Sequence, residues 1–301
     1  MNVLITGSNG FIGNHLVKRI KKVYDSVYEW NRDGIFFNEK KICDVDVTDP
    51  TTINSALTMI LPNTIIHCMG AADVNKSITH PYEDLTSNYM STHNILFALK
   101  ETNIRCRFIL LSSAAVYGNP VFLPMSETAI INPLSPYALH KRAAEESCLY
   151  MHDNYGFDVK ILRIFSVYGP GLKKQIFWDM YRKIIENGEL VLFGSGNESR
   201  DYIYIDDLIN AIMLVIGDTT DNTIYNVGNG IEIKINYAAQ IFASEMNLDK
   251  SKVVFTGANR EGDPINWKAD ISKLKSIGYK MKVPFELGVK KYIRWVKGEQ
   301  L

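Results

Sequence analysis

Hydrophobic residues follow two alternating patterns along the chain. Short apolar runs with the length of buried strands alternate with segments whose apolar residues lie three or four positions apart, as on one face of a helix. Strands alternating with helices in this way require a parallel sheet with helical crossovers, so the chain is predicted to have an α/β fold. The expected strands are 3–6, 26–30, 64–68, 108–111 and 158–164, and the expected helices are 12–20, 51–61, 88–100 and 136–155.

A glycine-rich turn follows the first predicted strand, with glycines at positions 7, 10 and 13. The first glycine permits a tight turn, the second lets the backbone approach a pyrophosphate, and the third lets the helix pack closely on its strand. Backbone N–H groups at the start of the helix then face the anion. Strand, turn and helix in this order predict a Rossmann fold that binds a dinucleotide. The expected contacts from the turn are Gly7, Asn9, Gly10, Phe11, Ile12 and Gly13.

The end of the second predicted strand bears on the choice between NAD and NADP. In NAD-binding folds of this kind an acidic residue at this point accepts hydrogen bonds from the 2′-hydroxyl of the adenosine ribose. Here the strand runs into Asn31 and Arg32. Asn31 does not repel a 2′-phosphate and Arg32 can pair with one, so the sequence favours NADP. The alternative is NAD, with Glu29 or Asp33 contacting the ribose.

The alternation becomes less regular after the breaker cluster at 169–171. We expect residues 1–168, with 201–230 returning to them, to form a doubly wound Rossmann domain. Residues 169–200 and 231–301 are expected to form a smaller mixed α/β lobe that binds the substrate. The later elements expected are a strand at 202–205 and helices at 173–187, 206–216, 236–246 and 285–297.

Composition narrows the range of partners. The 33 basic residues balance the 33 acidic ones, so no net field attracts nucleic acid or an acidic membrane surface. The four cysteines and six histidines are scattered without zinc-ligand spacing, which predicts no metal site, and His67 in its apolar run is expected to be a packed structural histidine. No apolar segment approaches the roughly 18 residues that span a bilayer, and a strand beginning at Asn2 leaves no room for a signal peptide. We therefore expect a cytoplasmic protein.

Tyr137 and Lys141 lie four residues apart on a predicted helix and so share one of its faces. A neighbouring ammonium lowers the pKa of a phenol from about 10, which would make Tyr137 an acid or base near neutral pH. Ser113, at the end of the preceding predicted strand, is expected to hydrogen-bond the reacting oxygen. These three residues are the candidate catalytic group.

Together these features resemble the extended short-chain dehydrogenase/reductase family, specifically its NAD(P)-dependent sugar-nucleotide epimerase/dehydratase branch. The resemblance covers nearly the whole chain, and Asn88 matches a helix-breaking structural asparagine of the family. It implies that Tyr137 exchanges a proton with a sugar hydroxyl, while Lys141 binds the nicotinamide ribose and tunes the phenol. It also implies homodimers formed through the helix bearing Tyr137 and the helix beginning near Asn88. The further cofactor contacts that it implies are Asp46, Val47, Cys68, Met69, Gly70 and Ser112, with Tyr137 and Lys141.

The same resemblance places substrate contacts in the smaller lobe. Arg200 and Arg260 match arginines that bind the nucleotide diphosphate, as guanidinium groups do well. The alternative is that each arginine pairs with its neighbour, Asp201 or Asp263. Nucleoside-diphosphate sugars are the implied substrates.

Two further positions depart from the family pattern or bear on specificity. Ser166 replaces an asparagine that contacts the substrate diphosphate, and its hydroxyl can still donate a hydrogen bond. Trp267 falls where a residue limits the room around the sugar C2 substituent, which would disfavour N-acetylated sugars; packing in the core of the lobe is the alternative. The full implied set of substrate contacts is Ser113, Ser166, Arg200, Arg260 and Trp267.

The residues around 114–118 bear on the type of reaction. Dehydratases of this branch carry an Asp-Glu pair where this chain has Ala114 and Ala115, so elimination of water is not expected. The stretch at 112–118 instead resembles the corresponding motif of sugar-nucleotide 4-epimerases. We therefore expect a 4-epimerase that acts at C4 of a nucleoside-diphosphate sugar. The alternative is an NADPH-dependent reductase of a 4-keto-6-deoxy sugar nucleotide, which Asn31 and Ala72 favour because they replace residues that retain the cofactor in epimerases. A protein that only senses dinucleotides is a third possibility, although it would not need both Tyr137 and Lys141.

Overall fold

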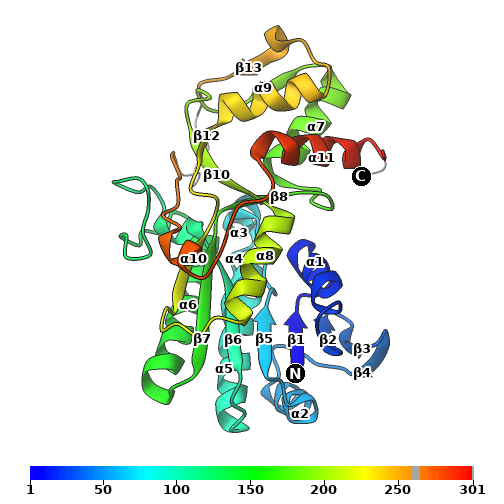
Figure 1. Cartoon of the computed structure of the whole chain (residues 1–301), viewed down its shortest axis with the longest axis vertical. Coiled ribbons are helices and arrows are strands. Elements are labelled where there is room, and N and C mark those ends of the chain that lie inside the picture. Colours follow the sequence, from blue (N-terminus) through cyan, green and yellow to red (C-terminus); the bar gives the residue numbers. More distant parts are fainter. Residues whose placement is uncertain (259–264, 300–301) are drawn as a thin grey trace. The chain divides into compact units, whose positions relative to one another are not determined.

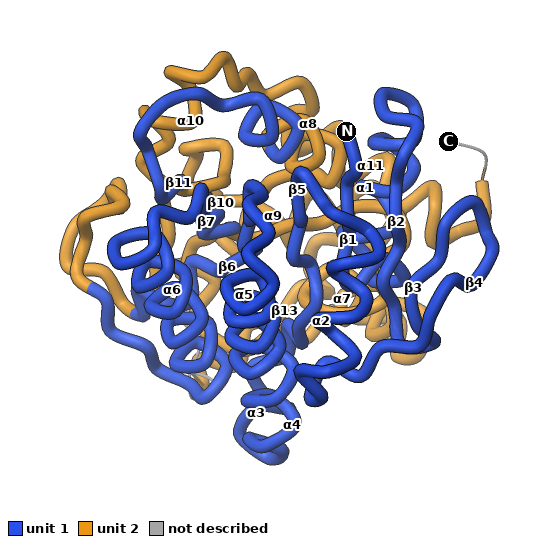
Figure 2. Tube along the Cα trace, turned by 90° about the horizontal axis from the view of Figure 1, so that it is seen from below, with its two compact units in different colours: residues 1–118, 131–164, 212–225 blue, residues 119–130, 165–211, 226–301 orange. Residues whose placement is uncertain are grey.

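The computed structural model describes residues 1–258 and 265–299. The chain divides into two compact units (Figure 2). Unit 1 comprises residues 1–118, 131–164 and 212–225, and unit 2 comprises residues 119–130, 165–211 and 226–301.

Unit 1 is built on an eight-stranded sheet in the order β11-β7-β6-β5-β1-β2-β3-β4 (Figure 1). Adjacent strands from β7 to β2 run parallel, and the hairpins to β3 and β4 add an antiparallel edge. This confirms the predicted Rossmann-type α/β fold. The strands are β1 (Asn2–Thr6), β2 (Ser26–Asn31), β3 (Gly34–Phe37), β4 (Lys40–Cys43), β5 (Thr64–His67), β6 (Arg107–Ser113), β7 (Asp158–Ile164) and β11 (Ile224–Val227).

Helices cover both faces of this sheet (Figures 1 and 2). Successive residues of a strand point to opposite faces, so Leu4 joins one hydrophobic core with α2, α5 and α6, while its buried neighbours Val3 and Ile5 face the side of α1. The helices of unit 1 are α1 (Phe11–Ile20), α2 (Pro50–Ile60), α3 (Val74–Thr79), α4 (Pro81–Leu85), a π-helical turn (Thr86–Met90), α5 (Ser91–Glu101), a 3₁₀ turn (Ala114–Tyr117) and α6 (Pro136–Tyr155), and α8 (Ile205–Ile216) ends in it.

Helix α6 has clear start and stop signals in the sequence. The hydroxyl of Ser135 accepts a hydrogen bond from the backbone N–H of Ala138, and Pro136 occupies the first turn, where its missing N–H costs nothing. Gly156 ends the helix in the left-handed conformation, with φ of +65°. The observed bounds equal the predicted ones, and they place Tyr137 in the first turn.

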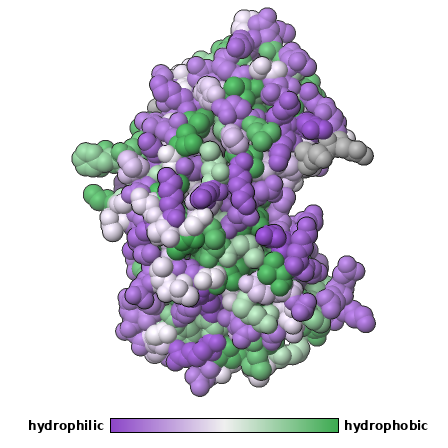
Figure 3. All heavy atoms as spheres, viewed as in Figure 1, coloured by the Kyte–Doolittle hydropathy of each residue, from purple (hydrophilic) through white to green (hydrophobic). Residues whose placement is uncertain are grey.

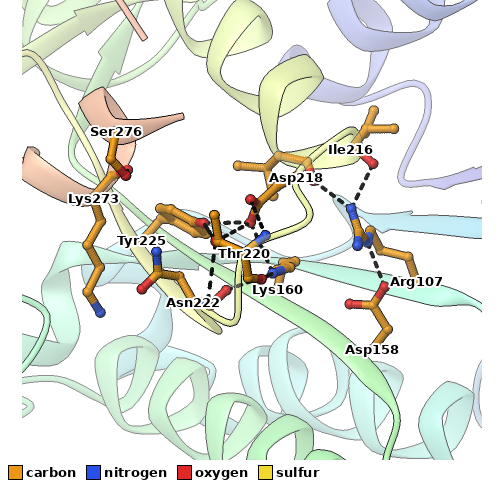
Figure 4. A network of polar contacts seen from close by, with 11 residues as sticks. Arg107, Asp158, Lys160, Ile216, Asp218, Thr220, Asn222, Tyr225, Lys273 and Ser276 are labelled. Atoms are coloured by element: carbon orange, nitrogen blue, oxygen red, sulfur yellow. Dashed lines mark hydrogen bonds and ion pairs between the residues drawn. The ribbon is translucent and has the colours of Figure 1, made fainter. Parts of the chain in front are cut away.

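A network of polar contacts fastens the segment after α8 to the sheet (Figure 4). Arg107 donates to the carbonyl oxygens of Val215 and Ile216 at the end of α8. The buried ammonium of Lys160 donates to two backbone carbonyls of the same segment and lies 3.0 Å from a carboxylate oxygen of Asp218. Tyr225 donates to the same carboxylate oxygen. This network explains why residues 212–225 belong to unit 1.

Unit 2 contains a three-stranded sheet in the order β12-β10-β8 and a parallel pair, β9 and β13. Its core is aromatic: the ring of Tyr168 lies 5.0–5.9 Å from those of Phe177, Tyr202, Tyr204 and Phe285. The strands are β8 (Ser166–Tyr168), β9 (Leu190–Leu192), β10 (Ser199–Tyr204), β12 (Glu232–Lys234) and β13 (Val253–Phe255), and the helices are α7 (Gln175–Asn187), α9 (Ile235–Glu245), a 3₁₀ turn (Lys250–Lys252), α10 (Ser272–Ser276) and α11 (Phe285–Val296).

The units differ from the predicted domains in three segments of the chain. Unit 2 begins at Phe165 instead of 169, because β8 pairs with β10 and not with the large sheet. The same pairing keeps 201–211 in unit 2, so the segment that returns to unit 1 is 212–225 instead of 201–230. Residues 119–130 also belong to unit 2, because the backbone of Met125 hydrogen-bonds with Lys268 and Asp270.

The loop at 119–130 carries exposed hydrophobic side chains. Val121, Phe122 and Ile130 are 75%, 82% and 77% exposed, respectively. The loop is the projecting blue-green segment at the left of Figure 1, where hydrophobic atoms project in Figure 3.

Candidate active site

The glycine turn has the close contacts that its spacing predicts. Gly7 has φ of +65°, and its carbonyl accepts a hydrogen bond of 2.9 Å from the N–H of Gly10. A Cβ atom built at Gly13 would lie 2.2 Å from the Gly7 oxygen, and one at Gly7 would lie 2.8 Å from the backbone nitrogen of Met69. Only glycine therefore fits at positions 7 and 13 without a backbone shift.

The residues of this turn fit a dinucleotide. Helix α1 begins after Gly10, which has no side chain to cap the first N–H groups, and its first turn contains no acidic residue that would repel an anion. Asn9 and Gly10 are exposed, and Phe11 and Ile12 are half-buried. The buried hydroxyl oxygen of Ser8 has no hydrogen-bond partner within the described residues. These groups can accept a pyrophosphate without competition from the protein.

Asn31 and Arg32 lie in the tight hairpin between β2 and β3, next to the glycine turn. The N–H of Ser8 donates to the carbonyl of Trp30, which ties the turn to the end of β2. The Asn31 side chain accepts a hydrogen bond of 2.8 Å from the N–H of Asp33, and Arg32 is exposed. Glu29, one of the alternative ribose contacts, forms an ion pair of 2.6 Å with Lys21.

Asp46 and Val47 lie in the loop between β4 and α2. The carboxylate of Asp46 is exposed and accepts hydrogen bonds from the N–H and hydroxyl of Thr48, which lower its pKa. The Val47 carbonyl accepts a hydrogen bond from Asn94 of α5. These bonds fix the loop that carries two of the predicted cofactor contacts.

The segment Cys68–Gly70 is held in place by a buried chain of hydrogen bonds through His67. The N–H of Met69 donates to the hydroxyl of Thr6, which lies 2.8 Å from Nδ1 of His67. Nε2 of His67 lies 3.3 Å from the hydroxyl of Ser91, which itself donates to a backbone carbonyl. Burial lowers the pKa of His67 to about 3, so the ring is neutral, as expected of a packed structural histidine.

Ser113, Tyr137 and Lys141 come together in unit 1. Both side chains of α6 are buried, with Tyr137 8% and Lys141 6% exposed. The phenol of Tyr137 forms a hydrogen bond with the Ser113 hydroxyl, and Nζ of Lys141 donates to the carbonyl of Leu111, 2.9 Å away. A Cβ built at Gly70 would lie 3.1 Å from the same Nζ, so the ammonium lies beside the segment after β5.

The pKa of Tyr137 differs from the prediction. Burial raises it to about 12, the hydrogen bond from Ser113 lowers it, and the charge of Asp84 raises it. The predicted net lowering is therefore wrong for this structure, because desolvation of the phenol outweighs the hydrogen bond from Ser113. Burial also lowers the pKa of Lys141 to about 8, against nearby anionic groups that raise it.

Asp84 and His140 were missed from the sequence as members of this site, and Asn88 was predicted only as a structural residue. Oδ2 of the buried Asp84 lies 2.6 Å from Nδ1 of His140, and its Oδ1 accepts a hydrogen bond of 2.8 Å from Asn88. Asn88 lies in the π-helical turn between α4 and α5, at the predicted break in the helix. Asp84 and His140 are 56 positions apart, and no spacing pattern connects them.

The hydroxyl of Ser112 serves a structural network. It donates to Oε1 of the buried Glu145, 2.6 Å away, and Glu145 forms a 2.8 Å ion pair with the buried Arg163. This network ties α6 to β6 and β7. Any contact of Ser112 with a dinucleotide would therefore have to come from its backbone.

Apart from Ser113, the predicted substrate residues that the structure describes lie in unit 2. Arg200 donates to the carbonyl oxygens of Ser199 and Ile265, and its guanidinium lies 5.6 Å from the ring centre of Trp267. The neighbouring carboxylate of Asp201 accepts hydrogen bonds from the N–H groups of Asn229, Gly230 and Ala269. Burial raises its pKa to about 6.

The remaining predicted substrate residues differ in their environment. Trp267 is only 8% exposed and packs edge-on against Phe165 at 5.9 Å, which is the packing described by the alternative. Ser166 is half-buried at the start of β8. Arg260 lies outside the described residues.

The described parts of the chain offer neither a membrane-spanning helix nor a cluster of metal ligands. In residues 1–258 and 265–299 the helices include none with the length and apolar character needed to cross a bilayer. The same residues contain no group of three or more His, Cys, Asp or Glu side chains that could hold a metal ion.

Sequence comparison relates the chain to nucleotide-sugar enzymes. A model of the NAD dependent epimerase/dehydratase family matches residues 3–228. A putative UDP-glucose 4-epimerase of Methanocaldococcus jannaschii is 29% identical over 98% of both chains. A UDP-glucuronate 4-epimerase of Thermodesulfobacterium geofontis is 28% identical over 98% of this chain and 95% of its own length.

Solved structures share the fold over nearly the whole chain. The UDP-glucose 4-epimerase of Thermotoga maritima, determined with UDP-glucose, has a TM-score of 0.87 at 25% identity, with 99% of both chains covered. A variant of UDP-glucuronic acid 4-epimerase from Bacillus cereus, in complex with a fluorinated sugar nucleotide and NAD, has a TM-score of 0.88 at 25% identity over 99% of both chains. These matches agree with the resemblance seen in the sequence: the chain belongs to the NAD-dependent epimerase/dehydratase family.

Proposed function

We propose that this protein is an NAD(P)-dependent 4-epimerase of nucleoside-diphosphate sugars. The observation that carries the proposal is the convergence of Ser113, Tyr137 and Lys141 in the unit that contains the glycine turn. The names of the relatives support UDP-hexoses and UDP-hexuronates as the substrate class. When bound, the dinucleotide supplies a hydride acceptor and donor.

In the proposed mechanism, one proton is transferred from and back to the C4 oxygen of the sugar by Tyr137, with the help of Ser113 and Lys141. Tyr137 removes the proton from the hydroxyl and returns it to the same oxygen after the sugar configuration has changed. Ser113 holds that oxygen through a hydrogen bond, and Lys141 binds the nicotinamide ribose and stabilises the phenolate form of Tyr137. This role of Lys141 matters because burial holds the pKa of Tyr137 at about 12, so the ammonium has to favour the phenolate for Tyr137 to act as a base.

Elimination of water finds no support at the residues next to Ser113. The positions that carry an acidic pair in dehydratases are Ala114, which is fully buried, and Ala115. Neither side chain can accept or donate a proton.

The test is turnover of a panel of UDP-, dTDP- and GDP-sugars by the purified protein. We expect the C4 isomer to form without net change in absorbance at 340 nm. Tyr137→Phe should lower kcat by at least ~100-fold, since general acid–base groups contribute about that much or more. Tyr82→Phe, a change at an 83% exposed tyrosine, is the control. Absence of the isomer with every sugar, or full activity of Tyr137→Phe, would contradict the proposal.

The second candidate function is an NADPH-dependent 4-keto reductase, which the surroundings of Arg32 favour. Arg32 is exposed in the hairpin beside the glycine turn. Glu29, the alternative ribose contact for NAD, forms an ion pair with Lys21. We therefore propose a preference for NADP, whichever reaction the enzyme performs. Fluorescence titration should give tighter binding of NADP than NAD, and Arg32→Ala should weaken only NADP. Tighter binding of NAD by the unmodified protein would overturn this preference. Stoichiometric consumption of NADPH with a 4-keto-6-deoxy sugar nucleotide would identify the reductase.

The proposed binding of the substrate uses Arg200 for the diphosphate, with Arg260 and Ser166 as further contacts. Arg200 is supported by its position against Trp267 and by the three N–H groups that already satisfy Asp201. Trp267 limits the room at sugar C2. UDP-N-acetylhexosamines should therefore react more slowly than the unacetylated sugars, and equal rates would refute this steric role.

The proposed assembly is a homodimer through α5 and α6. Leu139 and Tyr150 of α6 are 56% and 48% exposed, and both are apolar or aromatic. On α5 and the π-helical turn before it, the ring centre of His93 lies 5.6 Å from that of Tyr89 and 4.4 Å from that of Phe97.

The proposed compartment is the cytoplasm, supported by four cysteines that are all free thiols.

A further inference from the structure

A buried carboxylate next to the Tyr137–Lys141 pair has no part in the proton transfer described above. Asp84 is 3% exposed and lies on α4, which packs against α6. Its two oxygens have separate side-chain partners, His140 at 2.6 Å and Asn88 at 2.8 Å. His140 is the residue immediately before Lys141. The contact between Asp84 and His140 therefore holds the turn of α6 that carries Tyr137 and Lys141.

Asn88 contacts this carboxylate and also borders the space beside the ammonium of Lys141. Its amide nitrogen donates to Asp84 and to the carbonyl of Ala71. Its other side-chain atom, Oδ1, is buried and has no hydrogen-bond partner within the described residues. A Cβ built at Gly70 would lie 2.5 Å from this Oδ1 and 3.1 Å from Nζ of Lys141, so both atoms border the same small space.

We propose that Asp84, held by His140 and Asn88, is the counter-charge that keeps Lys141 in its ammonium form. The inference rests on the proposed function for its consequence in turnover, but not for the charge state itself. Asp84 is a positioning residue in this account. It acts through Lys141 and does not touch the substrate.

The other groups around Lys141 cannot serve as this counter-charge. Burial raises the pKa of Cys68 to about 12 and that of Cys148 well above its usual value, and it lowers that of His67 to about 3, so all three are neutral near pH 8. Glu145 already forms ion pairs with two arginines, Arg163 at 2.8 Å and Arg142 at 3.1 Å.

The buried Lys160 of β7, a strand that also packs against α6, forms an ion pair of 3.0 Å with Asp218. On α3 and α4, Lys76 and Glu83 pair with each other at 2.7 Å, and their side chains are 55% and 62% exposed. Water screens such a pair. Among the described residues, Asp84 is therefore a buried carboxylate near Lys141 whose ion-pair partner is a histidine and not a lysine or arginine.

Asp84→Asn removes the charge and keeps the shape. An asparagine oxygen can still accept from Asn88, and its N–H₂ can donate to Nδ1 of His140 once that ring carries its proton on Nε2. Loss of a nearby opposite charge disfavours an ammonium. The pH midpoint at which the Lys141 side chain loses its proton should therefore fall by about one pH unit. Glu83→Gln, one position earlier on the same helix, is the matched control and should leave the midpoint unchanged.

The experiment is an NMR titration of lysine ¹³Cε resonances in the full-length protein, with Lys141→Met to assign the signal. It needs no turnover, so it can be interpreted even if the proposed activity is wrong. A lower midpoint in Asp84→Asn supports the proposal, and a midpoint equal to that of the unmodified protein overturns it. If circular dichroism shows that Asp84→Asn does not fold, the smaller Asp84→Ser replaces it, with the same expected shift and the same contradicting result.

The consequence for turnover follows from the same shift. If Lys141 loses its proton at lower pH in Asp84→Asn, the alkaline limb of the kcat profile should move to lower pH by the same amount. A variant that merely loosened the fold would lower kcat at every pH. A limb that stays in place while the NMR midpoint moves would show that the charge of Lys141 does not limit the proposed reaction.

Discussion

At the scale of single residues, the cofactor turn depends on the absence of side chains at two positions. Gly13 allows α1 to approach the Gly7 carbonyl so closely that an added Cβ would lie 2.2 Å from its oxygen. Such a contact cannot be relieved by rotating a side chain, because both partners are backbone. The geometry of the turn, and with it the direction of the N–H groups toward a pyrophosphate, therefore requires this glycine.

We predict that Gly13→Ala weakens dinucleotide binding by at least ~100-fold, since the helix must move away from the turn that it helps to form. The measurement is calorimetric titration with NAD and NADP. Gly217→Ala is the matched control, because a Cβ there meets only an ordinary contact of 3.7 Å with Leu214. Unchanged affinity in Gly13→Ala would show that the dinucleotide binds elsewhere.

At the scale of elements, the sequence predicts long helices and central strands better than short edge elements. Helix α6 has the predicted bounds because Ser135, Pro136 and Gly156 mark its ends. The hairpin strands β3 and β4, and the three-residue strands β8 and β12, were not predicted. Strands of three or four residues are too short to show a periodicity, and they form here because a neighbouring strand offers hydrogen bonds.

The candidate site shows the same limit. Tyr137 and Lys141 could be predicted because their spacing is local, and Ser113 because it ends a strong strand. The contact between Asp84 and His140 depends on how α4 packs against α6, which no local pattern encodes. The raised pKa of Tyr137 has the same origin, since it comes from burial in the folded unit.

The polar network at β7 gives a prediction about pH and stability. The hydrogen bonds that Asp218 accepts from Tyr225, Thr220 and Lys160 lower its pKa to about 2, despite burial. A carboxyl whose folded pKa lies below its unfolded value of about 3.9 stabilises the fold above that value and loses this contribution as the pH falls toward 2. The denaturation midpoint of Asp218→Asn should therefore decrease less between pH 4 and pH 2 than that of the unmodified protein. An equally steep fall in the variant would contradict this role of the network.

At the scale of the whole molecule, the proposed homodimer makes a prediction about mass. Tyr150→Glu introduces a charge at a 48% exposed position of α6, where a dimer through α5 and α6 would bury it. Light scattering after size-exclusion chromatography should give a dimer for the unmodified protein and a monomer for the variant. Met59→Glu, at a 57% exposed position of α2, should remain dimeric. A dimeric Tyr150→Glu would place the interface elsewhere.

Unit 1 contains the glycine turn and the residues proposed for proton transfer, and unit 2 contains the arginine and tryptophan proposed for the substrate. What separates an epimerase from a reductase is the fate of the hydrogen at C4. An epimerase removes it and returns it to the same carbon, whereas a reductase draws hydrogen from a pool of NADPH at every turnover.

The most direct test of the central claim follows a sugar nucleotide labelled with deuterium at C4. UDP-glucose and UDP-glucuronic acid, each labelled in this way, are incubated with the enzyme, and the C4 epimer is isolated for mass spectrometry and NMR. The account predicts that the epimer keeps its deuterium at C4 and that none appears in water or in free dinucleotide. Deuterium in the free dinucleotide or in water, or formation of no epimer from either sugar, would contradict it.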